Sequence, residues 1–241
     1  MHYFDRRIKK RGVDWYLKQF AAGRDRVVGE KTPAYIRFPQ IPAIIKTYFP
    51  DIRLLFILRN PVQRAYSHYW HLRRQSLEFR SFEDAIEKPF WFGILRSPGY
   101  IERGMYAKQL KPWYATFDRS QILVVKAEDL RTDTRKVLNK VFDHIGVSRY
   151  LRIQTPSVHA GIVPRNLFHY AALLPVSLLR RMNNYRIESL HMLLSKTYGF
   201  LLRYGKSGYP QMDQQTRLRL QSVFAPHNKE LEDLTGVGWE H

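Results

Sequence analysis

The stretch Ile52-Arg-Leu-Leu-Phe-Ile-Leu-Arg-Asn-Pro-Val-Gln-Arg-Ala-Tyr-Ser67 decides the fold of this chain. Its apolar run, Leu54 to Leu58, is unbroken, as in a strand that is buried on both faces of a parallel sheet. The run ends at Arg59, and the Asn60-Pro61 pair after it suits the cap and first position of a helix. Residues Val62 to Gln75 contain neither Gly nor Pro. The stretch therefore predicts a strand, a tight turn and a helix.

Two further segments repeat this order of elements. Ile122 to Val125 predicts a second strand, and a helix capped by Asp133 and ended by Gly146 follows it. Val27-Val28 predicts a short third strand, and Ile41 to Phe49 predicts a helix after it. Strands that alternate with helices indicate an α/β fold, in which helices flank a parallel sheet.

Composition divides the chain and limits its chemistry. We expect an α/β core over residues 1–150, a basic helical insertion or lid over 151–208, and helices separated by Pro226 over 209–241, the first capped by Asp213. The 241 residues include no cysteine, which excludes disulfides, thiolate metal sites and a cysteine nucleophile. Neither a secretory signal nor a membrane span is predicted. The net charge of +19 favours phosphate, sulfate, nucleic acid or an anionic glycan as partner.

A candidate anion site lies where the strongest predicted strand ends. Arg59 stands there directly before a helix N-terminus, and open α/β sheets bind ligands at this edge. Ser67, about two helical turns further on, could donate to the same phosphate. Lys31 follows the predicted third strand and would meet a second anionic group at that edge. The alternatives are an Arg59 paired with a carboxylate and side chains of Ser67 and Lys31 that face solvent.

Two weaker candidates lie near the ends of the chain. His2 and Asp5 are three residues apart, close enough to share a site, although residues at a terminus are often frayed. Lys206 stands between two glycines. It could lie on a basic loop near a ligand, or it could belong to a plain surface turn. The spacing of those glycines does not fit a nucleotide-binding P-loop, which also requires a strand before it.

Together the motifs resemble a known family. Glu30-Lys-Thr-Pro-Ala-Tyr35, the stretch ending at Ser67, Arg103-Gly-Met-Tyr-Ala-Lys-Gln-Leu-Lys-Pro-Trp113 and Gln121-Ile-Leu-Val-Val-Lys-Ala-Glu-Asp-Leu130 are similar to the PAPS-dependent sulfotransferases, above all to the heparan sulfate N- and O-sulfotransferases and their bacterial relatives. PAPS, 3′-phosphoadenosine 5′-phosphosulfate, is the sulfuryl donor. The resemblance implies the P-loop-like sulfotransferase fold. It runs from about His2 to Gly146 and resumes at Tyr209-Pro-Gln-Met-Asp213 and Phe224-Ala-Pro-His-Asn228.

The resemblance also implies roles for single residues. Arg59 and Ser67 would hold the 3′-phosphate of the donor. Lys31 would lie near the transferred group, and His2 and Asp5 would flank the acceptor hydroxyl or amine.

The remaining nucleotide-side candidates follow from the same resemblance. Arg103 and Tyr106 would belong to a helix beside the 3′-phosphate, which Pro112 should kink or shorten. Lys206 is a further candidate for contact with the nucleotide. No metal is implied.

One departure from the family concerns its first strand and the Gly-x-x-Lys-x-Gly-Thr loop that cradles the 5′-phosphosulfate. Neither the strand nor the loop is found in these residues. The family also places a catalytic Glu two residues before the histidine that matches His2, a position just before Met1. We therefore expect an N-terminally truncated chain, whose upstream in-frame codons encode that Glu and, about 20 residues earlier, the strand and loop.

The sequence thus predicts a sulfotransferase that moves a sulfuryl group from PAPS to a hydroxyl or amine of a glycan-like, anionic acceptor. One alternative is a fragment that binds 3′,5′-ADP (PAP) or an anionic glycan without turnover. Another is a protein that binds nucleic acid through charge alone, although no DNA- or RNA-binding module shows its signature.

We predict that the 241-residue chain by itself has no measurable sulfotransferase activity. Loss of one preorganised hydrogen-bond donor, such as one from the 5′-phosphosulfate loop, lowers a rate by ~10²–10³. Loss of the catalytic Glu as general base lowers it by a further ~10²–10⁴. The measurement is transfer of labelled sulfate from PAPS to desulfated heparan. Robust turnover would show that another segment supplies these groups.

Overall fold

The computed structural model describes two compact units. The described residues are 2–23, 26–75, 77–87, 99–149, 162–163, 172–173, 175–177, 179, 188–202 and 206–239. The first unit comprises Met1–Asn60, Met105–Gln154 and Val223–His241. The second comprises Pro61–Gly104 and Thr155–Ser222.

The elements follow one another in the order expected of an α/β protein. The first unit contains the π-helical turn η1 (Tyr3–Arg7), α1 (Ile8–Lys18), η2 (Ala21–Gly23), η3 (Tyr35–Arg37), α2 (Ile41–Tyr48), β1 (Leu54–Leu58), α5 (Tyr106–Thr116), η5 (Arg119–Gln121), β2 (Ile122–Lys126), α6 (Asp129–Thr132) and α7 (Thr134–Ile145). The second contains α3 (Pro61–Arg74), α4 (Phe82–Glu87), η4 (Glu102–Gly104), β3 (Ile162–Val163), α9 (Glu188–Leu202) and β4 (Lys206–Ser207). The last helix, α10 (Gln214–Thr235), begins in the second unit and ends in the first.

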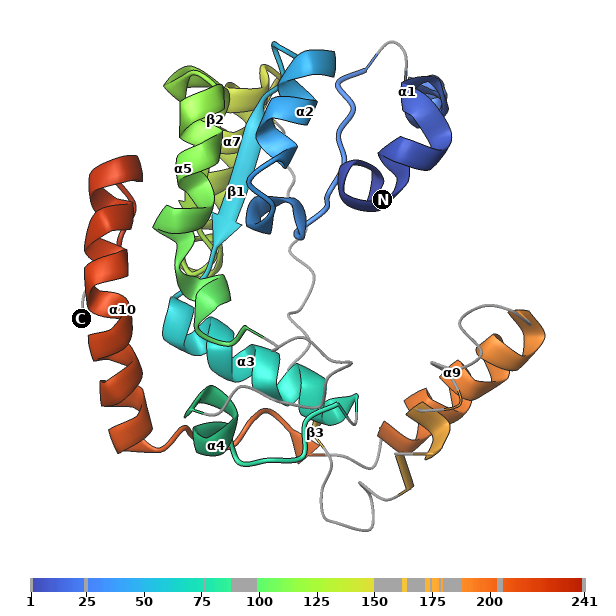
Figure 1. Cartoon of the computed structure of the whole chain (residues 1–241), viewed down its shortest axis with the longest axis vertical. Helices are drawn as coiled ribbons and strands as arrows, with labels where there is room; N and C mark the ends of the chain where they lie inside the picture. The colour runs from blue at the N-terminus through green and yellow to red at the C-terminus, as the bar shows by residue number, and fades with distance from the viewer. Residues whose placement is uncertain are drawn as a thin grey trace. The chain divides into compact units, whose positions relative to one another are not determined.

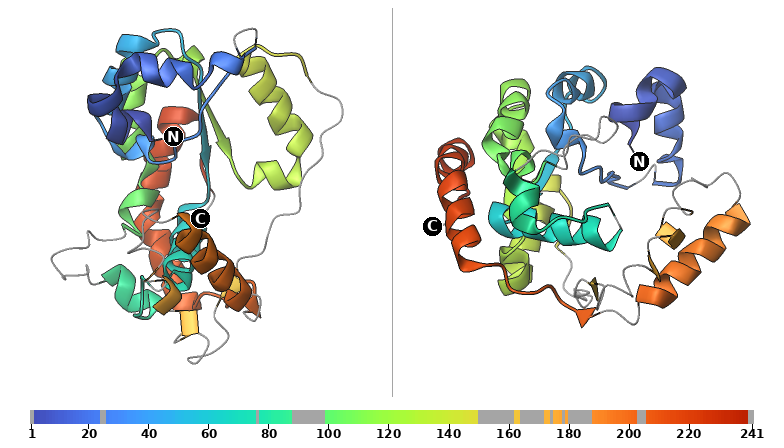
Figure 2. Two further views of the ribbon diagram at one scale, coloured as in Figure 1. Left: turned by 90° about the vertical axis from the view of Figure 1, so that its right-hand side faces the viewer. Right: turned by 60° about the horizontal axis from the view of Figure 1, so that its bottom comes forward.

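A parallel pair of strands forms the centre of the first unit. Strand β1 pairs with β2 so that Leu54 lies opposite Ile122 and Leu58 opposite Lys126, and Figure 2 shows the two strands side by side. The strand, turn and helix predicted over 52–75 are confirmed, with α3 starting at Pro61.

Burial of β1 differs from the expectation. Leu54 and Leu58 are buried, but Leu55 and Ile57 are 38% and 53% exposed. Helices α2 and α5 (Figure 1) contribute to the same core as Leu54 and Leu58, whereas the described residues cover the opposite face only in part. The prediction of a strand buried on both faces is therefore wrong.

The core of the first unit is rich in aromatic rings. Its buried members are Tyr3, Phe4, Tyr16, Tyr35, Ile41, Ile45, Leu54, Leu58, Tyr106, Ala107, Leu110, Trp113, Phe117, Ile122, Val124 and Leu231. Burying one large apolar side chain contributes about 1.5–3 kcal/mol. Because this core includes residues from the N-terminal turn and from η3, it fixes those two short segments as firmly as the helices.

Local signals predicted the helix after β2 correctly. The Asp133 side chain accepts a hydrogen bond from the backbone N–H of Lys136 at 3.0 Å and caps α7. The helix ends at Gly146, whose φ of 73° is the left-handed conformation that favours glycine. The helix expected from Ile41 is also confirmed, as α2.

The third strand is not formed. Val27 and Val28 lie outside any strand and are 63% and 48% exposed. Two adjacent valines place their side chains on opposite sides of the backbone. Without a partner strand to complete a ladder, such a short run gains little from becoming a strand.

Two helices continue through an internal proline. Pro112 does not shorten α5, which runs to Thr116, and Pro226 does not divide α10. The expectation of separate C-terminal helices is wrong because tertiary burial offsets the lost backbone hydrogen bond. Phe224 and Leu231, on either side of Pro226, are both fully buried. The predicted cap is confirmed, since the Asp213 carboxylate accepts the N–H of Thr216 at 2.9 Å.

The second unit contains an aromatic cluster between α3 and α4. The rings of Tyr66 and Tyr69 lie 5.0 Å and 5.2 Å from that of Phe82.

Helix α9 confirms part of the predicted helical stretch Leu167 to Leu202, most of whose earlier residues lie outside the described ones. Strands β3 and β4 pair antiparallel. Within the described residues, every helix is too short or too polar to cross a membrane.

We predict that Leu110→Ala destabilises the protein far more than Leu17→Ala. Leu110 on α5 is fully buried, whereas Leu17 on α1 is 48% exposed. A cavity of this kind costs about 2–5 kcal/mol, and a surface truncation about 0.5 kcal/mol or less. Urea unfolding measures both free energies. Equal losses would contradict the assignment of α5 to the core.

Candidate functional site

Residues 2–5 and 30–35 form one hydrogen-bonded neighbourhood in the first unit. The Nδ1 atom of His2 lies 2.9 Å from Oδ2 of Asp5, whose side chain is 2% exposed against 42% for His2. The backbone N–H of His2 donates to Oγ1 of Thr32 at 3.3 Å. His2 has a φ of 55°, an uncommon value for a residue other than glycine. The predicted His2–Asp5 pair is therefore formed, and it lies against the segment that bears Lys31.

Two more hydrogen bonds tie these segments together. The Tyr35 hydroxyl accepts the backbone N–H groups of Tyr3 at 2.9 Å and of Phe4 at 3.1 Å. Lys31 is exposed and directly precedes Thr32. The structure thus brings the three residues expected near the acceptor into two adjoining segments, one containing the His2–Asp5 pair and the other containing the exposed Lys31.

A second neighbourhood lies where β1 ends. Arg59 is half-buried there, and its carbonyl accepts the Tyr106 hydroxyl at 2.9 Å. The backbone N–H of Ala127 donates to the carbonyl of Leu58 at 2.7 Å. These bonds fix the backbone from which the Arg59 side chain extends. Tyr106 therefore holds the strand end, and its contact with nucleotide remains a prediction.

Glu128 completes the end of β1. Its Oε1 accepts the backbone N–H of Asn60 at 2.9 Å, and its Oε2 accepts the indole N–H of Trp239 at 3.2 Å. The Trp239 ring lies 6.0 Å from that of Tyr106. Sequence reasoning missed this role of Glu128, and the only signal for it was an acid immediately after the second strand.

The second unit holds Ser67 and Arg103. Ser67 is half-buried on α3, and its hydroxyl has no hydrogen bond to any described residue. The next residue, His68, lies 3.2 Å from Nη1 of Arg103 through its Nε2. Arg103 belongs to η4 and not to the helix expected over 103–113, which begins at Tyr106. Arg59 lies in the first unit.

Lys206 is placed differently from the expectation. Its backbone belongs to β4, where it lies opposite Val163 of β3, so it is part of a short antiparallel pairing and not of a loop. A two-residue antiparallel pairing satisfies backbone groups that a loop would leave to water.

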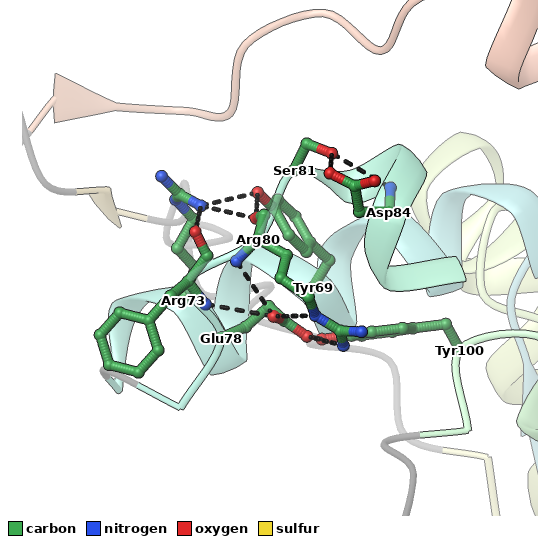
Figure 3. A network of polar contacts seen from close by, with 8 residues as sticks. Tyr69, Arg73, Glu78, Arg80, Ser81, Asp84 and Tyr100 are labelled. Atoms are coloured by element: carbon green, nitrogen blue, oxygen red, sulfur yellow. Dashed lines mark hydrogen bonds and ion pairs between the residues drawn. The ribbon is translucent and has the colours of Figure 1, made fainter. Parts of the chain in front are cut away.

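A buried carboxylate organises the region that follows α3 (Figure 3). Glu78 is 2% exposed, and its carboxylate accepts hydrogen bonds from Nε and Nη2 of Arg80 at 2.9 Å and 2.8 Å. The Tyr100 hydroxyl donates to Glu78 at 3.1 Å, and the backbone N–H groups of Phe79 and Arg80 donate to it as well. Although burial opposes it, this donor set lowers the pKa of Glu78. Sequence analysis gave no signal for the network.

The network reaches α3 through a neighbouring arginine. Nη1 of Arg73 donates to the Arg80 carbonyl at 2.8 Å and to the Tyr69 hydroxyl at 3.0 Å. Tyr69 in turn donates to the same carbonyl at 2.9 Å. The helix that carries Ser67 is thereby tied to residues 78–80.

Comparisons with known proteins show the family of this chain. The family model described as "Sulfotransferase domain" matches residues 2–157. The chain is 28% identical to human heparan sulfate glucosamine 3-O-sulfotransferase 3B1, over 99% of this chain and 56% of that protein. It is 27% identical to human bifunctional heparan sulfate N-deacetylase/N-sulfotransferase 3, over 97% of this chain and 25% of that protein. The chain spans about half the length of the 3-O-sulfotransferase.

A solved structure shows the same fold. The crystal structure of a sulfotransferase from Alicyclobacillus acidocaldarius matches with a TM-score of 0.62 and 23% identity, covering 95% of this chain and 73% of that one. The predicted α/β class, with helices beside a parallel sheet, is confirmed.

We predict that Glu78→Gln flattens the acid limb of the stability profile. The folded-state pKa of Glu78 lies below its ordinary value of 4.5. The ionised group therefore stabilises the fold above that value, and its contribution is lost as the pH falls through the lower, folded-state pKa. At pH 7 the variant should be about 1.5–3 kcal/mol less stable, and the difference should shrink in acid.

Urea unfolding between about pH 3 and pH 7 measures this difference. Glu232→Gln, at an exposed acid, is the matched control and should leave the profile nearly unchanged. A constant difference between Glu78→Gln and the parent across this range would contradict the depressed pKa.

Proposed function

We propose, from the premise that this chain belongs to the sulfotransferase domain family, that it is a domain of an enzyme that moves a sulfuryl group from PAPS to a hydroxyl or amine of an anionic glycan. The family membership confirms the resemblance and makes the protein a transferase. One observation carries the finer proposal: the family match includes both segments, 2–5 and 30–35, that hydrogen-bond to each other around His2, Asp5 and Lys31.

The acceptor class follows from the relatives and from charge. The names of the two human relatives specify 3-O- and N-sulfotransfer, to a hydroxyl and to an amine of heparan sulfate. A net charge of +19 attracts a polymer of sulfated sugars and uronic acids. We therefore place a glycan of this class as the acceptor.

The proposed reaction is an in-line displacement at sulfur. A lone pair of the acceptor oxygen or nitrogen forms the new bond to sulfur, and the bond from sulfur to the 5′-phosphate oxygen breaks. 3′,5′-ADP leaves with that electron pair, and the acceptor loses its proton to a base. Positioning and charge neutralisation supply most of the acceleration in such a transfer.

Residues of the first unit suit the acceptor side of this reaction. Lys31 would neutralise charge on the sulfuryl oxygens. Because His2 uses Nδ1 in its pair with Asp5, its Nε2 is the ring nitrogen left for the acceptor group. No described residue bonds to that atom.

The donor side would rest on the end of β1 and on α3. We propose that Arg59 and Ser67 hold the 3′-phosphate, with Arg103 and Lys206 as further cations for the nucleotide. Tyr106 supports this assignment indirectly, because its hydroxyl holds the Arg59 carbonyl.

Arg59→Ala should weaken binding of 3′,5′-ADP by about 10- to 150-fold, because a charge-assisted contact to a desolvated phosphate is worth roughly 1.5–3 kcal/mol. Adenosine, which lacks the 3′-phosphate, should bind both forms almost equally. Isothermal titration calorimetry measures both affinities.

Arg53→Ala is the matched control, because it removes the same charge just before the amino end of β1. Arg53 is exposed and donates to the Ser120 carbonyl at 2.8 Å. Its loss should change the affinity for 3′,5′-ADP little. Equal affinities of the Arg59 variant and the parent would refute the role of Arg59. Steeply salt-dependent, sequence-blind DNA binding without 3′,5′-ADP binding would instead favour a charge-driven nucleic-acid binder.

A further inference from the structure

The Tyr35 hydroxyl stands at the start of the N-terminal turn, η1. The first N–H groups of any helical turn lack partners within it and need acceptors from elsewhere. Here a single phenol oxygen accepts two of them in succession, from Tyr3 at 2.9 Å and from Phe4 at 3.1 Å. Tyr35 therefore caps the turn from a distance of about 30 residues along the chain.

These hydrogen bonds are shielded from water. Tyr3, Phe4 and Tyr35 are 0%, 4% and 8% exposed. The ring of Phe4 lies 5.7 Å from that of Tyr35, and the ring of Tyr3 stacks on Tyr16 at 4.5 Å. Water cannot replace an acceptor in such a place, so loss of the hydroxyl would leave two buried donors unsatisfied.

Tyr35 is itself fixed to the segment that bears Lys31. Its backbone N–H donates to the Thr32 carbonyl at 3.1 Å. Thr32 also accepts the His2 N–H through its side chain. The short stretch from Lys31 to Tyr35 thus contacts the His2 to Asp5 stretch through Thr32 and through Tyr35.

The phenol is held in its neutral form. Burial chiefly, and the Glu30 carboxylate beside it, raise the pKa of Tyr35 to about 12. Both oxygens of Glu30 are shielded from solvent, and neither reaches hydrogen-bond geometry with a described residue. A protonated hydroxyl keeps its lone pairs for the two N–H groups.

We infer that Tyr35 is a positioning residue, which sets the His2–Asp5 pair against Lys31 by accepting the N–H groups of Tyr3 and Phe4. The significance of this geometry for sulfuryl transfer rests on the proposed function, but the geometry does not. Because the turn and the Lys31 segment are bonded to each other, the two halves of the acceptor side would hold one fixed spacing.

The test compares Tyr35→Phe with Tyr48→Phe. Both remove one hydroxyl and keep the ring, and Tyr48 is 45% exposed with no hydrogen bond of its side chain to a described residue. Amide hydrogen exchange should accelerate about tenfold or more at Tyr3 and Phe4 in Tyr35→Phe. It should stay unchanged in Tyr48→Phe, and protection on α5 should persist in both. Unchanged exchange at Tyr3 and Phe4 would overturn the inference.

A second measurement follows the histidine directly. Diethyl pyrocarbonate carbethoxylates the His2 ring, and mass spectrometry measures the rate of this modification. In Tyr35→Phe this rate should change from that of the parent toward that of Asp5→Asn. Tyr48→Phe should match the parent. If Tyr35→Phe does not fold, Thr32→Ala serves instead, because it removes the acceptor of the His2 N–H and keeps the ring. A parent-like rate in the folded variant would contradict the positioning role.

The third measurement is affinity for a sulfated heparan oligosaccharide. Tyr35→Phe and His2→Ala should each weaken this affinity. The loss of binding free energy in the double variant should be smaller than the sum of the two single losses, because the two residues act together. Affinity for 3′,5′-ADP should be unchanged in all three. Additive losses would overturn the inference. If the parent bound neither ligand, the proposed function would fail, and exchange and carbethoxylation would still decide the role of Tyr35.

Discussion

The parallel pairing of β1 with β2 is the constraint on which the first unit depends. Carboxyl ends of parallel strands meet at the same edge, and the register continues one step further because Ala127 donates to Leu58. Arg59 and Glu128 therefore follow their strands at one edge. Glu128 can then reach the backbone of Asn60, and a helix from another part of the chain supplies Tyr106 to the same place.

Acidic side chains in this basic protein are used to hold backbone segments. The chain has 21 Asp and Glu against 40 Lys and Arg, and several of the acids lie inside it. Asp5 pairs with His2, Glu128 accepts Asn60 and Trp239, and Glu78 accepts two backbone N–H groups besides Arg80. Acids engaged in this way stabilise loops without lining the outer surface. The net charge of +19 keeps the surrounding field positive, which would suit the anionic donor and acceptor proposed above.

Sequence reasoning succeeded where the signal was local. The run from Leu54 to Leu58 with a proline after it, and the cap at Asp133, depend on residues within a few positions. It failed where distant packing decides: Val27 lacked a partner strand, and burial around Pro226 outweighed the proline. The bond from Tyr35 to Phe4 joins residues 31 apart, and no spacing rule connects a phenol to such distant amides. The motifs therefore supplied candidate residues for the site, but they did not show what holds those residues in place.

The two sides of the proposed site are supported in different ways. The donor side begins at a sheet edge, where hydrogen bonds to the carbonyls of Leu58 and Arg59 fix the backbone from which the Arg59 side chain extends. The acceptor side has no strand, and the turn beginning at Tyr3 is too short to be stable alone. A transfer site needs its groups held to about 0.5 Å, and side chains on irregular backbone reach that precision only when other bonds lock them. The Tyr35 hydroxyl and the Thr32 side chain supply such bonds, so the segment that contains the exposed Lys31 also holds the turn that carries His2.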